Sequence, residues 1–68
     1  MLNIQLNGKS TELPKSIHSV QDLLTFYSLE NRIVIVEVNK EIIFKEQYPS
    51  LTLSNKDTVE IVHFVGGG

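Results

Sequence analysis

Three consecutive glycines, Gly66, Gly67 and Gly68, follow a strand-like run and end the sequence. Glycine suits the end of a strand poorly, because it loses the most conformational freedom on ordering and has no side chain to pack. Three glycines do provide a narrow, flexible peptide with a free carboxylate, which can reach roughly 10 Å into a channel of a partner. The alternative is a frayed chain end or a cloning remnant. The rest of the chain has to decide between these interpretations.

Other groups that could do chemistry are sparse. His18 and His63 are far apart in the sequence, and without cysteine they indicate a metal site only weakly, so surface or hydrogen-bonded histidines are the simpler interpretation. Glu37 and Glu60 fall in strand-like runs and could form a carboxylate pair, although solvated strand faces show the same pattern. We therefore predict no metal, no bound cofactor and no catalytic residue within the chain.

The length and composition predict one small domain, residues 1–65, followed by a glycine tail at 66–68. The chain has 68 residues, a net charge of −2 and no cysteine, which excludes disulfides, thiolate zinc sites and a cysteine nucleophile. Acids and bases are interspersed, so no basic run marks a nucleic-acid binder. No apolar stretch approaches the roughly 20 residues of a membrane span. We expect a soluble, cytoplasmic protein that is monomeric when free.

The first strands are predicted by alternation and by a turn signal. Apolar and polar residues alternate over 2–6, and Asn7-Gly8 follows, the dipeptide that best accepts a type I′ turn. A hairpin should therefore return over 9–13. Pro14 lacks an amide hydrogen and ends the pairing, which suits an edge strand.

A helix is predicted over 20–27. Ser19 can cap its first amides, and Asp22 completes a capping-box pattern. Val20, Leu23, Leu24 and Tyr27 share one face by spacing. That face should pack on the sheet.

The second half of the chain is rich in strands. The β-branched run 33–38 predicts a central strand covered on much of both faces, and a turn at 39–40 leads to a short arm at 42–44. Loop or one helical turn is expected over 45–57, with Leu51 and Leu53 anchored in the core. A last strand covers 58–65. The order β-β-α-β-β-β predicts an α+β fold in which one sheet packs on one helix.

The hairpin, the capped helix and the ending, Val59-Glu60-Ile61-Val62 two residues before Val65-Gly66-Gly67-Gly68, resemble the ThiS family, the sulfur carriers of thiamin biosynthesis. The resemblance covers the whole chain and implies a ubiquitin-like β-grasp, a mixed five-stranded sheet packed on one helix. Family members often have Asp-Gly-Asp before the last strand, where this chain has Ser54-Asn55-Lys56-Asp57. That difference leaves the geometry of the turn open.

The resemblance implies that Gly68 is the working residue. An E1-like enzyme would adenylate its carboxylate, a sulfur donor such as a cysteine desulfurase would lead to a thiocarboxylate, and thiazole synthase would receive the sulfur. The carboxylate is ionised at neutral pH and can attack the α-phosphate of ATP, after which sulfur displaces AMP. ATP and Mg²⁺ belong to the activating partner, because the chain has no phosphate-cradling loop. The protein is then a co-substrate and not an enzyme.

The docking surface is predicted from strand alternation. If Val59 and Ile61 face the helix, Val62 and Phe64 face outward beside the tail, and by the same alternation Ile35 joins them from the strand predicted to be central. Such an open apolar patch is typical of a partner interface, although a few exposed apolar residues are also ordinary.

Two other functions fit the same sequence. The small subunit of molybdopterin synthase is a β-grasp carrier that also ends in Gly-Gly, but it is usually longer. A non-covalent interaction module would use its sheet and leave the carboxylate idle.

Overall fold

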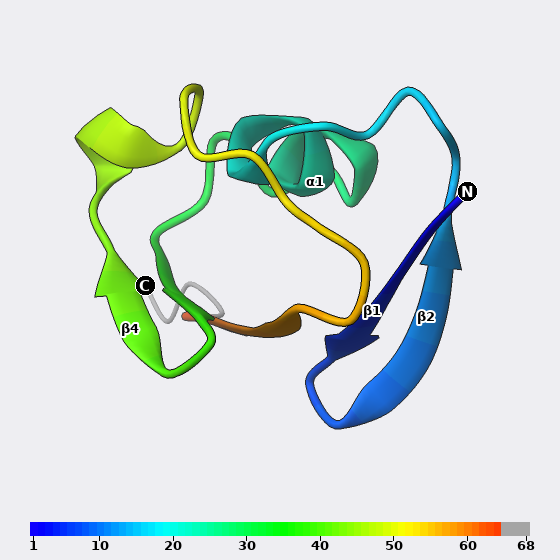
Figure 1. The fold of residues 1–68 in the computed structure, drawn as a ribbon. Helices are drawn as coiled ribbons and strands as arrows, with labels where there is room; N and C mark the ends of the chain where they lie inside the picture. Colours follow the sequence, from blue (N-terminus) through cyan, green and yellow to red (C-terminus); the bar gives the residue numbers. More distant parts are fainter. Residues whose placement is uncertain (65–68) are drawn as a thin grey trace.

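The computed structural model of the protein describes residues 1–64. These residues form five strands, one α-helix and one short 3-10 helix: β1 (Leu2–Leu6), β2 (Lys9–Leu13), α1 (Val20–Phe26), β3 (Val34–Val38), β4 (Glu41–Ile43), η1 (Lys45–Gln47) and β5 (Thr58–His63). The strands make one sheet in the order β2-β1-β5-β3-β4. The sheet curves around α1, which covers one of its faces (Figure 1). The predicted mixed β-grasp architecture is confirmed.

The first hairpin follows the sequence prediction. β1 and β2 pair antiparallel from Leu2 opposite Leu13 to Leu6 opposite Lys9. Asn7 and Gly8 both have positive φ, 50° and 82°, as a type I′ turn requires. β2 lies at the edge of the sheet and ends directly before Pro14, so the proline removes no hydrogen bond from an inner strand.

α1 begins as predicted and ends one residue early. The hydroxyl of Ser19 accepts from the Asp22 amide at 3.0 Å, and Asp22 Oδ2 accepts from the amides of His18 and Ser19 at 2.9 and 3.0 Å. These backbone hydrogen bonds lower the pKa of the Asp22 carboxyl. Tyr27 is the C-cap and is 41% exposed. Its predicted place on the buried face is wrong, because the helix has ended before that face continues.

The position of β3 corrects a prediction. β5 is the central strand, paired parallel with β1 and antiparallel with β3, and β3 lies between β5 and the edge strand β4. β3 is also covered on one face only, since Val36 is fully buried while Ile35 is 43% exposed. A single helix can cover only one face of a sheet, so the apolar residues of the other face stay open.

The segment from η1 to β5 returns the chain across the helix. Leu53 is buried in the core and Leu51 packs against the core, as predicted. The turn at Ser54–Asp57 closes through a hydrogen bond from the Asp57 amide to the Ser54 carbonyl at 3.1 Å and one from the Ser54 amide to Asp57 Oδ2 at 2.8 Å. Lys56 takes φ = 73° there. The turn thus forms with lysine in a conformation that glycine adopts more readily.

The core lies between the sheet and α1. Its fully buried side chains come from both layers: Leu13, Val20, Leu23, Leu24, Val36 and Val59. No polar or charged residue among those described is buried. The core of the described residues is therefore built from apolar side chains and the ring of Tyr48.

Candidate functional site

The chain leaves the sheet from its middle. β5 ends at His63, and the amide of Phe64 still donates to the carbonyl of Ile33 at 3.2 Å. The predicted tail residues Gly66, Gly67 and Gly68, and the end of the predicted strand at Val65, lie outside the described residues. The structure does establish the position of β5 and of Phe64, the last described residue before the tail.

Two asparagines from flanking turns hold β5 in place. Asn7, at the β1–β2 turn, accepts from the Ile61 amide through Oδ1 at 2.8 Å and donates from Nδ2 to the Ile61 carbonyl at 3.2 Å. Asn39, at the β3–β4 turn, accepts from the Thr58 amide at 2.9 Å and donates to Asp57 Oδ1 at 3.0 Å. Both asparagines have left-handed backbones, with φ of 50° and 51°. Each turn residue thus also fixes the strand that leads to the tail.

The faces of β5 are as predicted from alternation. Val59 and Ile61 point into the core and are 0% and 8% exposed, whereas Val62 and Phe64 are each 54% exposed. Ile35 is the cross-strand partner of Val62. The three residues predicted for an interface therefore lie together on the open face of the sheet, next to the start of the tail.

Further exposed apolar residues extend this face beyond the predicted three. Ile42 in β4 and Phe44 just after it are 56% and 65% exposed, and Ile33 before β3 is 75% exposed. We call the six residues the open-face patch: Ile33, Ile35, Ile42, Phe44, Val62 and Phe64. The alternation of residues in 41–44 could have indicated that Ile42 and Phe44 share a face. So short a strand, however, has too few residues for its two faces to be assigned from the sequence.

The other candidate residues from the sequence, two histidines and two glutamates, are arranged differently in the structure. His18 precedes α1, whereas His63 ends β5 beside a shallow hollow lined by Leu6 and Tyr27. Within residues 1–64, no group of three or more His, Cys, Asp or Glu side chains could hold a metal ion. Glu37 and Glu60, in contrast, are direct cross-strand partners. The two residues considered as a carboxylate pair are therefore opposite each other in the sheet.

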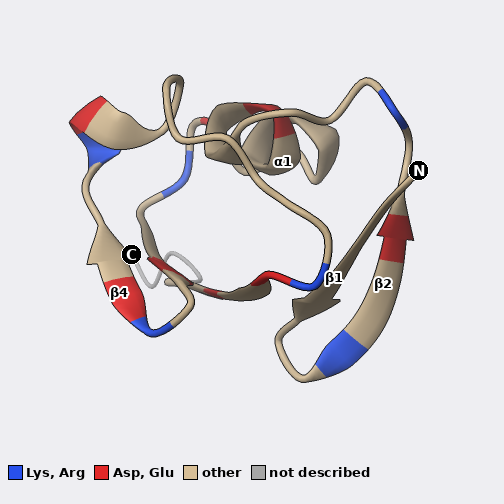
Figure 2. Cartoon of the chain, viewed as in Figure 1, with Lys and Arg blue, Asp and Glu red and all other residues tan. Residues whose placement is uncertain are grey.

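Charged residues of both signs are scattered over the described chain, on turns, on the helix and on inner as well as edge strands (Figure 2). Burial raises the pKa of the Tyr48 hydroxyl, but this group packs in the core and not beside the tail. No helix within residues 1–64 has the length and hydropathy to cross a membrane.

Comparison with known proteins explains this combination of fold and ending. A family model described as the ThiS family matches residues 4–68, and so includes all three glycines. The chain belongs to the ThiS family. The match favours this family over the small subunit of molybdopterin synthase as the nearest description of the sequence.

Individual relatives agree with membership of the ThiS family. The chain is 58% identical over 65 residues to a protein of Bacillus subtilis named sulfur carrier protein ThiS, covering 96% of this chain and 98% of that protein. A crystal structure of the thiamine biosynthesis protein ThiS from Geobacter metallireducens matches with a TM-score of 0.81 at 30% identity, covering 98% of this chain and 100% of that one.

Longer proteins also contain a ThiS-like segment. A protein of Paramagnetospirillum magneticum named thiazole synthase is 34% identical over 67 residues, which is 98% of this chain but only 20% of that protein. A second thiazole synthase, from Magnetococcus marinus, matches in the same way at 31% identity. In these proteins the ThiS-like segment is a small part of a larger chain.

Proposed function

We infer that the protein is a sulfur carrier in the formation of the thiazole part of thiamin, and that Gly68 carries the sulfur. The observation that supports this most directly is the family match, which runs through the glycines to the last residue. The Bacillus subtilis relative, similar over nearly its whole length, is itself named a sulfur carrier.

The chemistry follows from a carboxylate at the end of a side-chain-free peptide. One carboxylate oxygen of Gly68 attacks the α-phosphate of ATP, pyrophosphate leaves, and a mixed anhydride with AMP forms. The outer sulfur of a persulfide on the donor then attacks the activated carbonyl carbon and AMP leaves, which gives an acyl disulfide. A thiol of a partner protein cleaves the S–S bond, so that the thiocarboxylate leaves and a disulfide forms on the partners. An E1-like adenylating enzyme supplies ATP and Mg²⁺, and a cysteine desulfurase supplies the sulfur. We propose that the protein meets these partners in the cytoplasm.

The carrier acts as a co-substrate in this proposal. Gly66 and Gly67 pass through a channel that excludes side chains, and the folded domain provides the docking energy. Ordering three residues costs roughly 3 to 6 kcal/mol, which contacts elsewhere must offset. Ile35, Val62 and Phe64, exposed on one face beside the start of the tail, are suited to make those contacts.

Thiazole synthase is the proposed acceptor of the sulfur. Support comes from the two proteins of that name in which a segment similar to this chain occupies about a fifth of the length. Fusion of two functions in one chain raises their effective concentration for each other. A carrier that is a separate protein, as proposed here, has to bind thiazole synthase through its docking surface instead.

One measurement tests the central step. The intact mass of protein purified from its own cells should include a fraction in which one oxygen has been exchanged for sulfur, and fragmentation should place that exchange at Gly68. Protein lacking Gly68 is the matched control, and it should show no such fraction and no ATP-dependent pyrophosphate exchange with the activating enzyme. Exchange by the shortened protein at the full rate would refute the carboxyl-terminal mechanism.

A further inference from the structure

The open face of the sheet is arranged in rows that cross the strands. Toward the start of β5, Ile42, Glu37 and Glu60 are consecutive cross-strand neighbours on β4, β3 and β5. The next row contains Ile35 and Val62, and one step further the Phe64 amide bonds to the Ile33 carbonyl. The face is therefore apolar beside the tail and acidic toward the start of β5.

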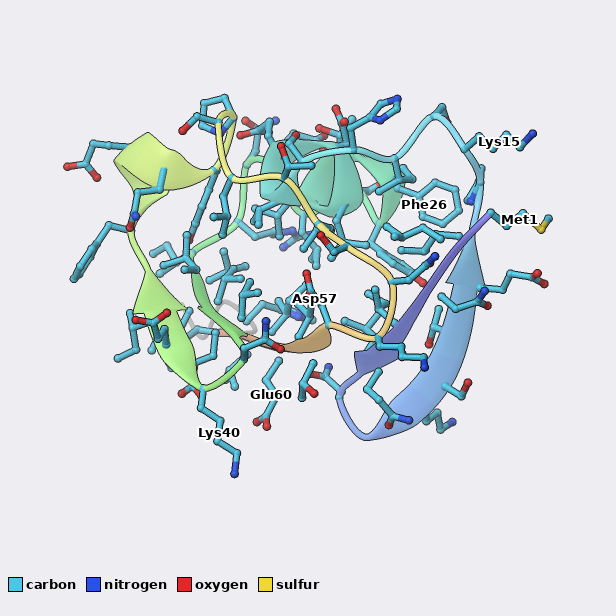
Figure 3. All side chains as sticks on the ribbon, viewed as in Figure 1. Met1, Lys15, Phe26, Lys40, Asp57 and Glu60 are labelled. Atoms are coloured by element: carbon cyan, nitrogen blue, oxygen red, sulfur yellow. The ribbon has the colours of Figure 1, made fainter. Side chains whose placement is uncertain are left out.

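The two carboxylates do not serve the fold. Glu37 and Glu60 lie directly opposite each other, and like charges in that position destabilise a sheet. The side chain of Glu60 points away from α1, from the outer side of the sheet (Figure 3). An arrangement that costs stability and faces outward among exposed apolar residues is expected at a functional surface.

We propose that the open-face patch docks the adenylating partner through an apolar surface that carries one arginine or lysine, and that this cation contacts Glu37 and Glu60 together. This inference rests on the proposed function and adds the chemistry of the partner. The spacing along β5 sets the geometry. Glu60 lies four residues before Phe64, roughly 13 Å along the strand, so the cation sits at that distance from the point where the tail enters its channel.

Charge complementarity selects this occupant. In a symmetric pair of copies joined through the patch, four carboxylates would meet in one interface, which is strongly unfavourable. A nucleic acid would add its own negative charge to theirs. A guanidinium is well suited, because its planar fork can donate to two carboxylates and its faces pack on apolar groups such as Ile42.

The test compares two variants with the same change of net charge. Glu37→Gln/Glu60→Gln removes the acidic pair, and Glu12→Gln/Glu30→Gln removes two exposed acids elsewhere. Calorimetric titration into the activating enzyme measures docking independently of chemistry, and ATP–pyrophosphate exchange gives KM and kcat for the carrier. Thermal melts verify that the variants fold.

For the variant without the acidic pair, we expect the Kd and the KM to rise about tenfold with kcat unchanged, since a lost charge pair at an interface costs at least that much. Raising the salt concentration should weaken the wild type more than this variant. The control should stay within about twofold of the wild type. An equal Kd for both variants, or a dimer of the Glu37→Gln/Glu60→Gln variant in sedimentation, overturns the docking proposal. Tight docking of the wild type without any pyrophosphate exchange instead overturns the proposed function alone.

Discussion

The side chain of Asn7 pairs with both backbone groups of Ile61, as a residue of a neighbouring strand would. The backbone ladder between β1 and β5 ends with the Asn7 amide donating to the Val59 carbonyl at 2.9 Å. The amide side chain then extends the pairing two residues further along β5, toward the tail. Asn7 therefore has two functions, because its left-handed backbone also forms the hairpin turn.

Replacing Asn7 separates these two functions. Asn7→Gly keeps the turn but removes both hydrogen bonds, and should lower the free energy of unfolding by about 1 to 3 kcal/mol because the Ile61 groups lose their partners. Asn7→Ala should cost about 1 kcal/mol more, since alanine is strained at positive φ. Urea denaturation measures both. If Asn7→Gly is as stable as the wild type, the side-chain clamp contributes nothing.

The substitution Gly67→Val tests whether the tail has to be free of side chains. This substitution keeps the terminal carboxylate but adds a branched side chain to a peptide that must pass through a narrow channel. Activation by the adenylating enzyme should fall steeply while the thermal midpoint stays within about 1 °C of the wild type, because Gly67 follows the strands that form the described sheet. Unchanged pyrophosphate exchange would mean that the channel does not exclude side chains.

Ile61 in β5 and Phe64 directly after it separate docking from folding. Phe64→Ala removes a half-exposed aromatic ring beside the tail, and should weaken partner binding by about 2 kcal/mol, roughly thirtyfold, with little effect on stability. Ile61→Ala leaves a cavity under the same strand and should cost about 2 to 5 kcal/mol of stability. Calorimetric binding and thermal melts distinguish the two. The reverse pattern would place the docking surface on the other face of β5.

The start of α1 should contribute to the pH dependence of stability. Hydrogen bonds from the His18 and Ser19 amides hold the pKa of Asp22 below its ordinary value of 3.8. The folded state therefore favours the carboxylate, so this contribution is complete above the ordinary pKa and is lost as the pH falls through the lowered value. Asp22→Asn should be less stable than the wild type at pH 7, and the difference should shrink below pH 4 in acid titrations followed by circular dichroism. A difference independent of pH would assign the cap to hydrogen bonding alone.

The elements with strong local signals could be predicted from the sequence. Asn7-Gly8 marked the first hairpin, and Ser19 with Asp22 marked the start of the helix, because each acts through hydrogen bonds or φ preferences of adjacent residues. The order of strands in the sheet depends on contacts between distant segments. The apolar run at 33–38 therefore suggested a doubly covered central strand, whereas β5 takes that position.

The prediction of the site was limited by the same difficulty, that the sequence does not show which faces of a strand are covered. A strand with apolar residues on both faces can be buried on both or can leave one face exposed, and Ile35 shows that β3 is of the second kind. Val62 and Phe64 could be assigned because β5 is long enough for its alternation to be read. The opposition of Glu37 and Glu60 needed the register of two strands that are far apart in sequence.

The central position of β5 also determines how the domain responds to mechanical force. A partner that grips the carboxyl end and pulls loads β5 along its own axis, and β5 is bonded to β1 on one side and to β3 on the other. The hydrogen bonds of both ladders lie across the direction of pulling, so they share the load in shear and would have to rupture nearly together. An edge strand would peel away one bond at a time. In the proposed function, tension on the last residues would therefore be shared by the two ladders.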